Sequence, residues 1–103
     1  IAWRRVLVEK IKGNLDFRIA INSAEDWPPV SVLREKGWEQ ILTELAESQQ
    51  EITAALSSRT DSFLDEVYSE SYTYRFLIEA VLQHDVYHIG QIGLLSSVIK
   101  ATK

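Results

Sequence analysis

The sequence predicts an all-α fold, a four-helix bundle whose first helix lies upstream of Ile1 and therefore outside the given chain. Three stretches place apolar residues at the three- and four-residue spacing of an amphipathic helix. The 103 residues are enough for one domain and too few for two. The chain has no methionine and opens on IAWRRVLVEK, which already has the pattern of a helix interior. We therefore expect a single helical-bundle domain over residues 1–103 that is incomplete at its N-terminus.

Composition excludes several classes of function. Hydrophobic residues make up 46% of the chain and charged residues 25%, with a net charge of −4. The lysines and arginines are scattered, whereas nucleic acids and anionic membranes call for a clustered basic face. Absence of cysteine excludes disulfides, zinc–thiolate sites and a cysteine nucleophile. No signal peptide is visible, and no apolar run approaches the roughly 20 residues of a transmembrane helix. We expect a cytoplasmic protein with no nucleic-acid or membrane partner.

The first expected helix covers residues 1–12 and ends at Gly13. Its apolar face consists of Trp3, Val6, Leu7 and Ile11. The connector NLDFRIAINSAEDWPPV follows, in which FRIAI is a candidate strand without an obvious partner. Connectors of this length often line functional sites.

The second expected helix runs as one amphipathic stretch over residues 30–58, with Ser31 as a candidate N-cap. Gly37 is a weak point near its start, because glycine has low helix propensity. The polar turn region that follows is anchored by Phe63, Leu64 and Val67. Thr73 or Ser71 then caps the last helix, which extends to Ala101.

The residues that carry chemistry lie on the last helix. Its inward stripe reads Tyr74, Leu77, Val81, His84, His88, Gln91, Leu95 and Val98. The only two histidines are four residues apart, so both imidazoles project from one face and suit a single metal ion. A pair of hydrogen-bonded core histidines without a metal is the alternative. An unpartnered buried polar cluster costs several kcal/mol, and this favours the metal.

Two imidazoles do not complete a catalytic metal site, since three protein ligands plus water is the common arrangement. Within the chain, Glu9, Asp16 and Glu44 are candidate third ligands; a residue upstream of Ile1 is the other option. HDVYH also resembles the zinc-protease pattern H-E-x-x-H. Asp85 is one methylene shorter than glutamate and no further ligand follows His88, so a protease site is not favoured.

Neighbouring residues have expected supporting roles. Gln91 either binds a ligand or metal-bound water or bridges helices as a buried amide. Tyr87 is expected to pack toward a neighbouring helix, and Asp85 to face solvent or accept from an imidazole N–H. Core packing is the expected role of the tryptophans Trp3, Trp27 and Trp38. Trp27, which precedes two prolines, is placed near a pocket mouth.

The segment HDVYHIGQI, residues 84–92, resembles the C-terminal signature of the DinB-like (YfiT-like) superfamily: histidine, three residues, histidine, then Gly-Gln-Ile. The stretches DWPPVSVLREKGWEQ and IAWRRVLVEK are also similar to this family. The resemblance implies an up-down-down-up four-helix bundle that binds a divalent metal through three histidines. His84 and His88 match two of them, and the third would immediately precede Ile1.

The resemblance also implies a function. Members include bacillithiol- or mycothiol-dependent transferases or isomerases and metal-dependent hydrolases. In such chemistry a zinc, nickel, iron or manganese ion acidifies a low-molecular-weight thiol or a water molecule. Arg4, Arg5 and Arg75 are candidates to bind the carboxylates of a thiol cofactor. The alternative is a non-catalytic, stress-associated bundle that binds a small ligand or partner, with structural histidines.

A second apolar face lies on the last helix, away from the histidine stripe. It consists of Leu82, Val86, Ile89, Gly90 and Gly93. Apolar faces left exposed usually contact a partner, so we expect a homodimer through this face. The alternative is that a helix upstream of Ile1 covers it within the monomer.

Overall fold

The computed structural model describes residues 1–102, which form four α-helices, one short 3₁₀-helix and one two-stranded hairpin. In chain order the elements are α1 (Ala2–Ile11), α2 (Val30–Lys36), α3 (Trp38–Ser57), η1 (Asp61–Asp65), β1 (Val67–Ser69), β2 (Tyr72–Thr73) and α4 (Tyr74–Ala101). The predicted all-α class is confirmed, because the antiparallel hairpin of β1 and β2 has only two short strands.

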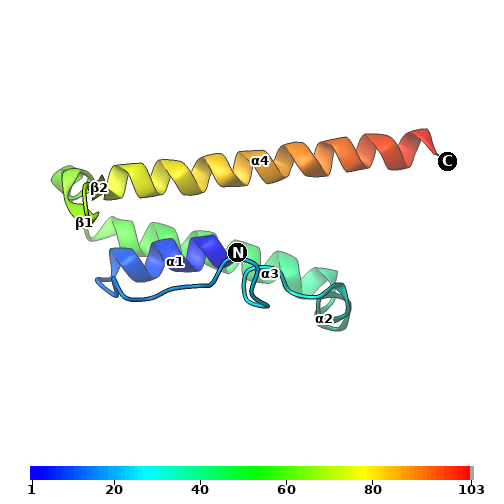
Figure 1. The fold of residues 1–103 in the computed structure, drawn as a ribbon, viewed down its shortest axis with the longest axis horizontal. Coiled ribbons are helices and arrows are strands. Elements are labelled where there is room, and N and C mark those ends of the chain that lie inside the picture. Colours follow the sequence, from blue (N-terminus) through cyan, green and yellow to red (C-terminus); the bar gives the residue numbers. More distant parts are fainter. Residues whose placement is uncertain (103) are drawn as a thin grey trace.

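The helices form an elongated bundle with dimensions of 51 × 26 × 24 Å (Figure 1). Helix α1 lies beside α3 and also packs against α4, and α2 packs against α3. The hairpin and η1 connect α3 to α4 at one end of the molecule. Helix α4 extends well beyond the N-terminal end of α1, which lies near the middle of α4 (Figure 1). The middle of α4 is therefore where α1 begins to cover it.

The long helix expected over residues 30–58 is interrupted at Gly37. This glycine has φ 88° and ψ 151°, so α2 ends before it and α3 starts after it. Only glycine adopts this conformation without strain, which explains why the break falls here. The residue at the N-cap position of α2 is Pro29, not the expected Ser31. The FRIAI segment forms no strand and leads into turns.

The core lies where the C-terminal part of α1, η1 and the first turns of α4 meet. Its buried members are Leu7, Ile11, Phe63, Tyr74 and Val81. Phe63 stacks on Tyr74 with 4.1 Å between ring centroids. Of the three predicted anchors of this region, Phe63 is buried and Leu64 half-buried, whereas Val67 is exposed.

Helix α4 begins as predicted, because Thr73 occupies its N-cap and accepts a hydrogen bond from the Phe76 N–H at 3.2 Å. Its second half lies outside the core. From Ile89 to Thr102 every residue is exposed except the half-buried Ser96. Among the described residues, no helix combines the length and the apolar character needed to cross a lipid bilayer.

The prediction of core packing is wrong for Trp38, and Trp27, which was expected near a pocket mouth, also lies outside the core. Trp27 is 62% exposed and Trp38 is 68% exposed, whereas Trp3 is half-buried. Trp38 is the first residue of α3, at the end of the bundle that α1 does not reach (Figure 1). Trp27 belongs to the connector between α1 and α2, outside any helix.

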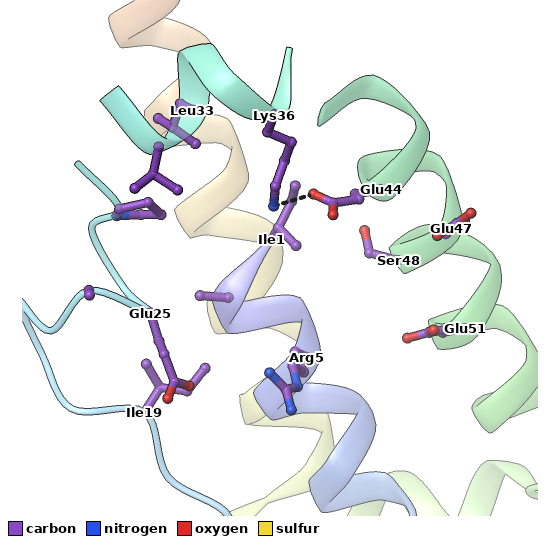
Figure 2. Close-up of a pocket in the computed structure, with 14 residues that line it drawn as sticks. Ile1, Arg5, Ile19, Glu25, Leu33, Lys36, Glu44, Glu47, Ser48 and Glu51 are labelled. Carbon is purple, nitrogen blue, oxygen red and sulfur yellow. Dashed lines mark hydrogen bonds and ion pairs between the residues drawn. The ribbon is translucent and has the colours of Figure 1, made fainter. Parts of the chain in front are cut away.

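A cavity of about 460 Å³ opens between α1, α2, α3 and the connector (Figure 2). Its polar lining includes four carboxylates, those of Glu25, Glu44, Glu47 and Glu51. Arg5 of α1 and Lys36 of α2 supply positive charge, and Lys36 pairs with Glu44 at 2.9 Å. Ala2 and Arg5 of α1, with Ile1 just before it, also line the cavity, on a different face of the helix from the one that contacts α4.

Tyr74 connects the start of α4 to the end of α1. Its hydroxyl donates a hydrogen bond to the Lys10 carbonyl at 3.1 Å, and burial raises the pKa of the Tyr74 phenol, opposed by the nearby Arg59. The buried Lys10 ammonium donates to the Leu15 carbonyl at 3.1 Å. Burial, and then the charge of Arg18, lower the pKa of Lys10.

Replacing Tyr74 with phenylalanine should lower the free energy of unfolding by about 1 kcal/mol at pH 7, because the buried Lys10 carbonyl loses a donor. Urea denaturation measures this difference. Tyr72→Phe is the matched control, since Tyr72 is 45% exposed and stacks on Phe76 through its ring. It should leave stability unchanged, and equal losses in both variants would contradict the role of the Tyr74 hydroxyl.

A comparison of the unmodified protein with Tyr74→Phe also tests the direction of the pKa shift of Tyr74. Because burial raises this pKa in the folded state, the unfolded chain releases the phenolic proton first as pH rises. The unfolded state then binds fewer protons than the folded state, so stability falls as pH rises above about 10. The fall should be shallower in Tyr74→Phe, while the titrations of Lys10 and Tyr68 are common to both proteins. Identical slopes would contradict the expected shift.

Candidate metal centre

His84 and His88 lie one turn apart near the middle of α4, and both are half-buried. Their Nε2 atoms are 3.2 Å apart, and their rings are nearly perpendicular at 83°. For metal–nitrogen bonds of about 2.05 Å, this separation corresponds to an angle of about 100° at the metal. That angle is close to tetrahedral. The two imidazoles therefore have the spacing of two ligands of one divalent ion.

Gln91 orients the His88 ring and favours one tautomer of it. The Nδ1 atom of His88 lies 2.6 Å from the Gln91 Oε1 atom. An amide oxygen only accepts hydrogen bonds, so Nδ1 carries the proton and Nε2 keeps its lone pair. That lone pair faces the Nε2 atom of His84 at 3.2 Å. His88 is thus already in the tautomer that a metal ligand needs, which is the usual effect of a hydrogen-bond partner behind a histidine ligand.

Three aromatic rings surround the histidine pair. The Trp3 ring of α1 meets His84 edge-on at a centroid distance of 6.2 Å. The Trp27 ring of the connector meets His88 in the same manner at 6.3 Å. Tyr87 lies 5.6 Å from His88 and is 64% exposed, so its ring contacts the histidine and not the expected neighbouring helix.

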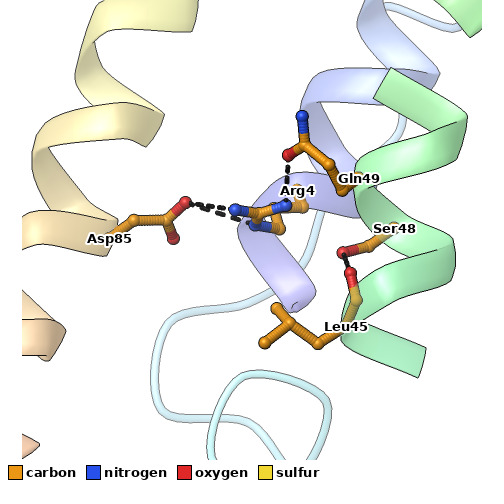
Figure 3. A network of polar contacts seen from close by, with 5 residues as sticks. All are labelled: Arg4, Leu45, Ser48, Gln49 and Asp85. Carbon is orange, nitrogen blue, oxygen red and sulfur yellow. Dashed lines mark hydrogen bonds and ion pairs between the residues drawn. The ribbon is translucent and has the colours of Figure 1, made fainter. Parts of the chain in front are cut away.

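Asp85, the residue between the histidines that was compared with a protease glutamate, pairs with Arg4 (Figure 3). Its Oδ2 atom accepts from Arg4 Nη2 at 2.8 Å and from Arg4 Nε at 3.2 Å. Arg4 Nη1 donates to Gln49 Oε1 of α3 at 2.8 Å. One guanidinium therefore connects α1, α3 and α4 beside His84. Arg4 and Asp85 are 81 positions apart, and no local pattern in the sequence indicated this pairing.

The carboxylates expected as third ligands do not join the histidines. Glu9 accepts a hydrogen bond from Asn14, and Glu44 pairs with Lys36 at the cavity. In the part of the chain that the structure describes, no three His, Asp or Glu side chains are grouped so that they could hold a metal ion. The prediction of Glu9, Asp16 or Glu44 as a ligand is therefore wrong for this arrangement.

The three arginines considered for an anionic cofactor do not converge. Arg4 is engaged by Asp85, Arg5 lines the cavity, and Arg75 pairs with the exposed Asp65 at 3.3 Å. The cavity and the histidine pair are separate sites, because neither histidine lines the cavity.

Comparison with the sequence models of protein families shows which family the chain belongs to. The sequence model of the DinB superfamily matches residues 1–92, which include His84, His88 and Gln91. This chain belongs to the DinB superfamily. The resemblance seen in HDVYHIGQI is therefore confirmed, and the DinB match ends within α4. Comparisons with curated proteins and with solved structures gave no significant match.

Substituting Asp85 with asparagine should lower the free energy of unfolding of this DinB superfamily protein by about 1–2 kcal/mol, because the half-buried Arg4 loses its charged acceptor. The matched control is Asp65→Asn, whose ion pair with Arg75 is 73% exposed on the aspartate side. Exposed pairs contribute little, so the control should change stability by less than about 0.5 kcal/mol. Urea denaturation compares the two, and equal effects would contradict the special role of Arg4.

Proposed function

We propose that this DinB superfamily protein binds a divalent metal ion through the Nε2 atoms of His84 and His88. The observation that supports the proposal most directly is the 3.2 Å separation of these two atoms. The hydrogen bond from His88 Nδ1 to Gln91 adds to it, since it leaves the Nε2 lone pair of His88 free of a proton. His84 and His88 therefore fit two of the coordination positions of a divalent ion.

A third protein ligand immediately before Ile1 is part of the proposal. The first turn of α1 lies beside the histidines, as the contacts of Trp3 with His84 and of Arg4 with Asp85 indicate. On a helix, a residue three positions before Trp3 and four before Arg4 shares their face. A histidine at that position of an extended α1 would therefore face His84 and His88.

A divalent ion at this site supplies Lewis acidity, which lowers the pKa of a thiol or water that it binds. The imidazoles are neutral donors and leave the charge of the ion uncompensated, while Gln91 holds the His88 ring in place. We propose that the protein is either a metal-dependent thiol transferase or a metal-dependent hydrolase. A transferase of this kind would use a low-molecular-weight thiol as its cosubstrate. Zinc, nickel, iron and manganese are all candidates.

The alternative is a non-catalytic module that binds a small ligand. The cavity of about 460 Å³ favours it, since this volume falls within the range of small-molecule sites. In that case His84 and His88 are a hydrogen-bonded pair with a structural role. The alternative predicts no stoichiometric metal, and His88→Ala then affects stability alone.

Metal binding is tested by equilibrium dialysis against Ni²⁺ followed by elemental analysis. We expect about one ion per chain, lost in His84→Ala and in His88→Ala, because each removes one of two nitrogen ligands. Tryptophan fluorescence gives a second readout. Trp3 and Trp27 lie within 6.3 Å of the imidazoles, so Ni²⁺ should quench their emission. Stoichiometric nickel retained by His84→Ala would count against the proposed site.

Gln91→Ala should weaken Ni²⁺ binding about tenfold or more, because partners that orient a histidine ligand typically contribute that much. Gln83→Ala is the matched control, as Gln83 is an exposed amide on the same helix. The control should bind Ni²⁺ like the unmodified protein. Equal affinities of the two variants would assign no role to Gln91.

We also propose that the chain forms a homodimer through the apolar face of α4 made of Leu82, Val86, Ile89, Gly90 and Gly93. Leu82, Val86 and Ile89 are each 59–67% exposed, and a Cβ placed on Gly90 or Gly93 would meet no atom within 4 Å outside the adjacent residues and local helix backbone. From Val86 to Ile99 the helix carries no Asp, Glu, Lys or Arg. Depletion of charge and large exposed apolar residues are typical of interface cores.

Sedimentation velocity tests the dimer. The unmodified protein should sediment as a dimer, and Val86→Glu as a folded monomer, because a charge is placed in the apolar face. Gln50→Glu adds the same charge at an exposed polar position on α3, away from this face, and should remain dimeric. A monomeric unmodified protein at high concentration would overturn the proposed interface.

A further inference from the structure

Two strongly exposed aromatic rings flank His88. Trp27 is 62% exposed and Tyr87 is 64% exposed, yet both lie within 6.3 Å of the His88 ring. Large aromatic surface left in water is unfavourable, and a ligand that covers it gains this free energy on binding. The aromatic surface lies beside the imidazole that Gln91 prepares for a metal.

We infer that the ligand of this site is a small molecule with a planar aromatic group, which packs against the exposed Trp27 ring beside His88 while its polar head reaches the ion at His84 and His88. The inference rests on the proposed metal site and names the class of its substrate. Aromatic rings prefer offset-stacked or edge-to-face contacts with one another, so the exposed Trp27 ring favours planar groups over saturated ones.

The backbone at Trp27 is held in place before any ligand binds. The backbone N–H of Trp27 donates to the Ser23 carbonyl at 2.8 Å, and Pro28 and Pro29 restrict the backbone that follows. Trp3, which is half-buried, closes the side of His84 that faces α1. A ring whose backbone is already fixed loses little conformational freedom on binding, which favours affinity.

The charges near His88 favour an uncharged ligand body. Arg4 neutralises Asp85, the one charged residue between the histidines. The following stretch, Val86 to Ile99, has no charged side chain. The carboxylates of the cavity belong to α3 and the connector, and the cavity that they line does not include His84 or His88. The chemistry near His88 thus matches an aromatic group better than a charged or highly polar one.

Three hydroxamates test the inference: benzohydroxamate, cyclohexanecarbohydroxamate and acetohydroxamate. All three bind divalent metals through the same two oxygen atoms and differ only in the attached group. Calorimetry on the nickel-loaded protein should give benzohydroxamate an affinity about three- to tenfold above that of the cyclohexyl compound, the range expected of one aromatic contact. Acetohydroxamate should bind most weakly.

Trp27→Ala should remove the preference for benzohydroxamate, and Trp27→Phe should keep part of it. Trp38→Ala is the matched control, because Trp38 is 68% exposed but lies at the start of α3; it should keep the full preference. Each variant is first checked for bound nickel. Absence of nickel in the unmodified protein overturns the proposed function and this inference together. Bound nickel with equal affinities for the phenyl and cyclohexyl compounds, or a preference that survives Trp27→Ala, overturns the inference alone.

Discussion

The contact of Arg4 with Asp85 and Gln49 determines how α4 sits against the other helices near the histidines. The Arg4 side chain is 17% exposed, and its guanidinium makes hydrogen bonds to side chains of two different helices. A partly buried cation of this kind is stable only with its acceptors in place, so the geometry tolerates little displacement. Since Asp85 directly follows His84, the position of the candidate metal ligand depends on an ion pair outside the ligand set.

Helix α1 is the centre of the molecule, although it is short. It contributes the most completely buried side chains, Leu7, Val8 and Ile11. One of its faces meets α4 through Trp3 and Arg4, and another lines the cavity. The histidine pair and the cavity therefore share helix α1 but no described lining residue. Residues of one site can be substituted without removing a residue of the other.

Local chemistry in the sequence was sufficient to predict part of this structure. The fold class, the Thr73 cap and the shared face of His84 and His88 follow from helical periodicity and capping, which depend on neighbours a few residues apart. The sequence indicated Gly37 only as a weak point in the helix. The low helix propensity of glycine does not show whether tertiary packing keeps the helix continuous at that position. The Arg4–Asp85 pair and the position of Trp27 beside His88 depend on tertiary arrangement, and neither has a signal in the local sequence.

The histidine pair lies at the boundary between the packed and the exposed halves of α4. Beyond it, almost every residue is exposed, and Gly90 and Gly93 weaken the helix further. That half relies largely on its own backbone hydrogen bonds, so it should fray readily from its C-terminal end. A metal held by both imidazoles would clamp one helical turn at this boundary. Amide hydrogen exchange past Ile89 would then slow when metal binds, and the far end of the helix would report on occupancy without touching the ion.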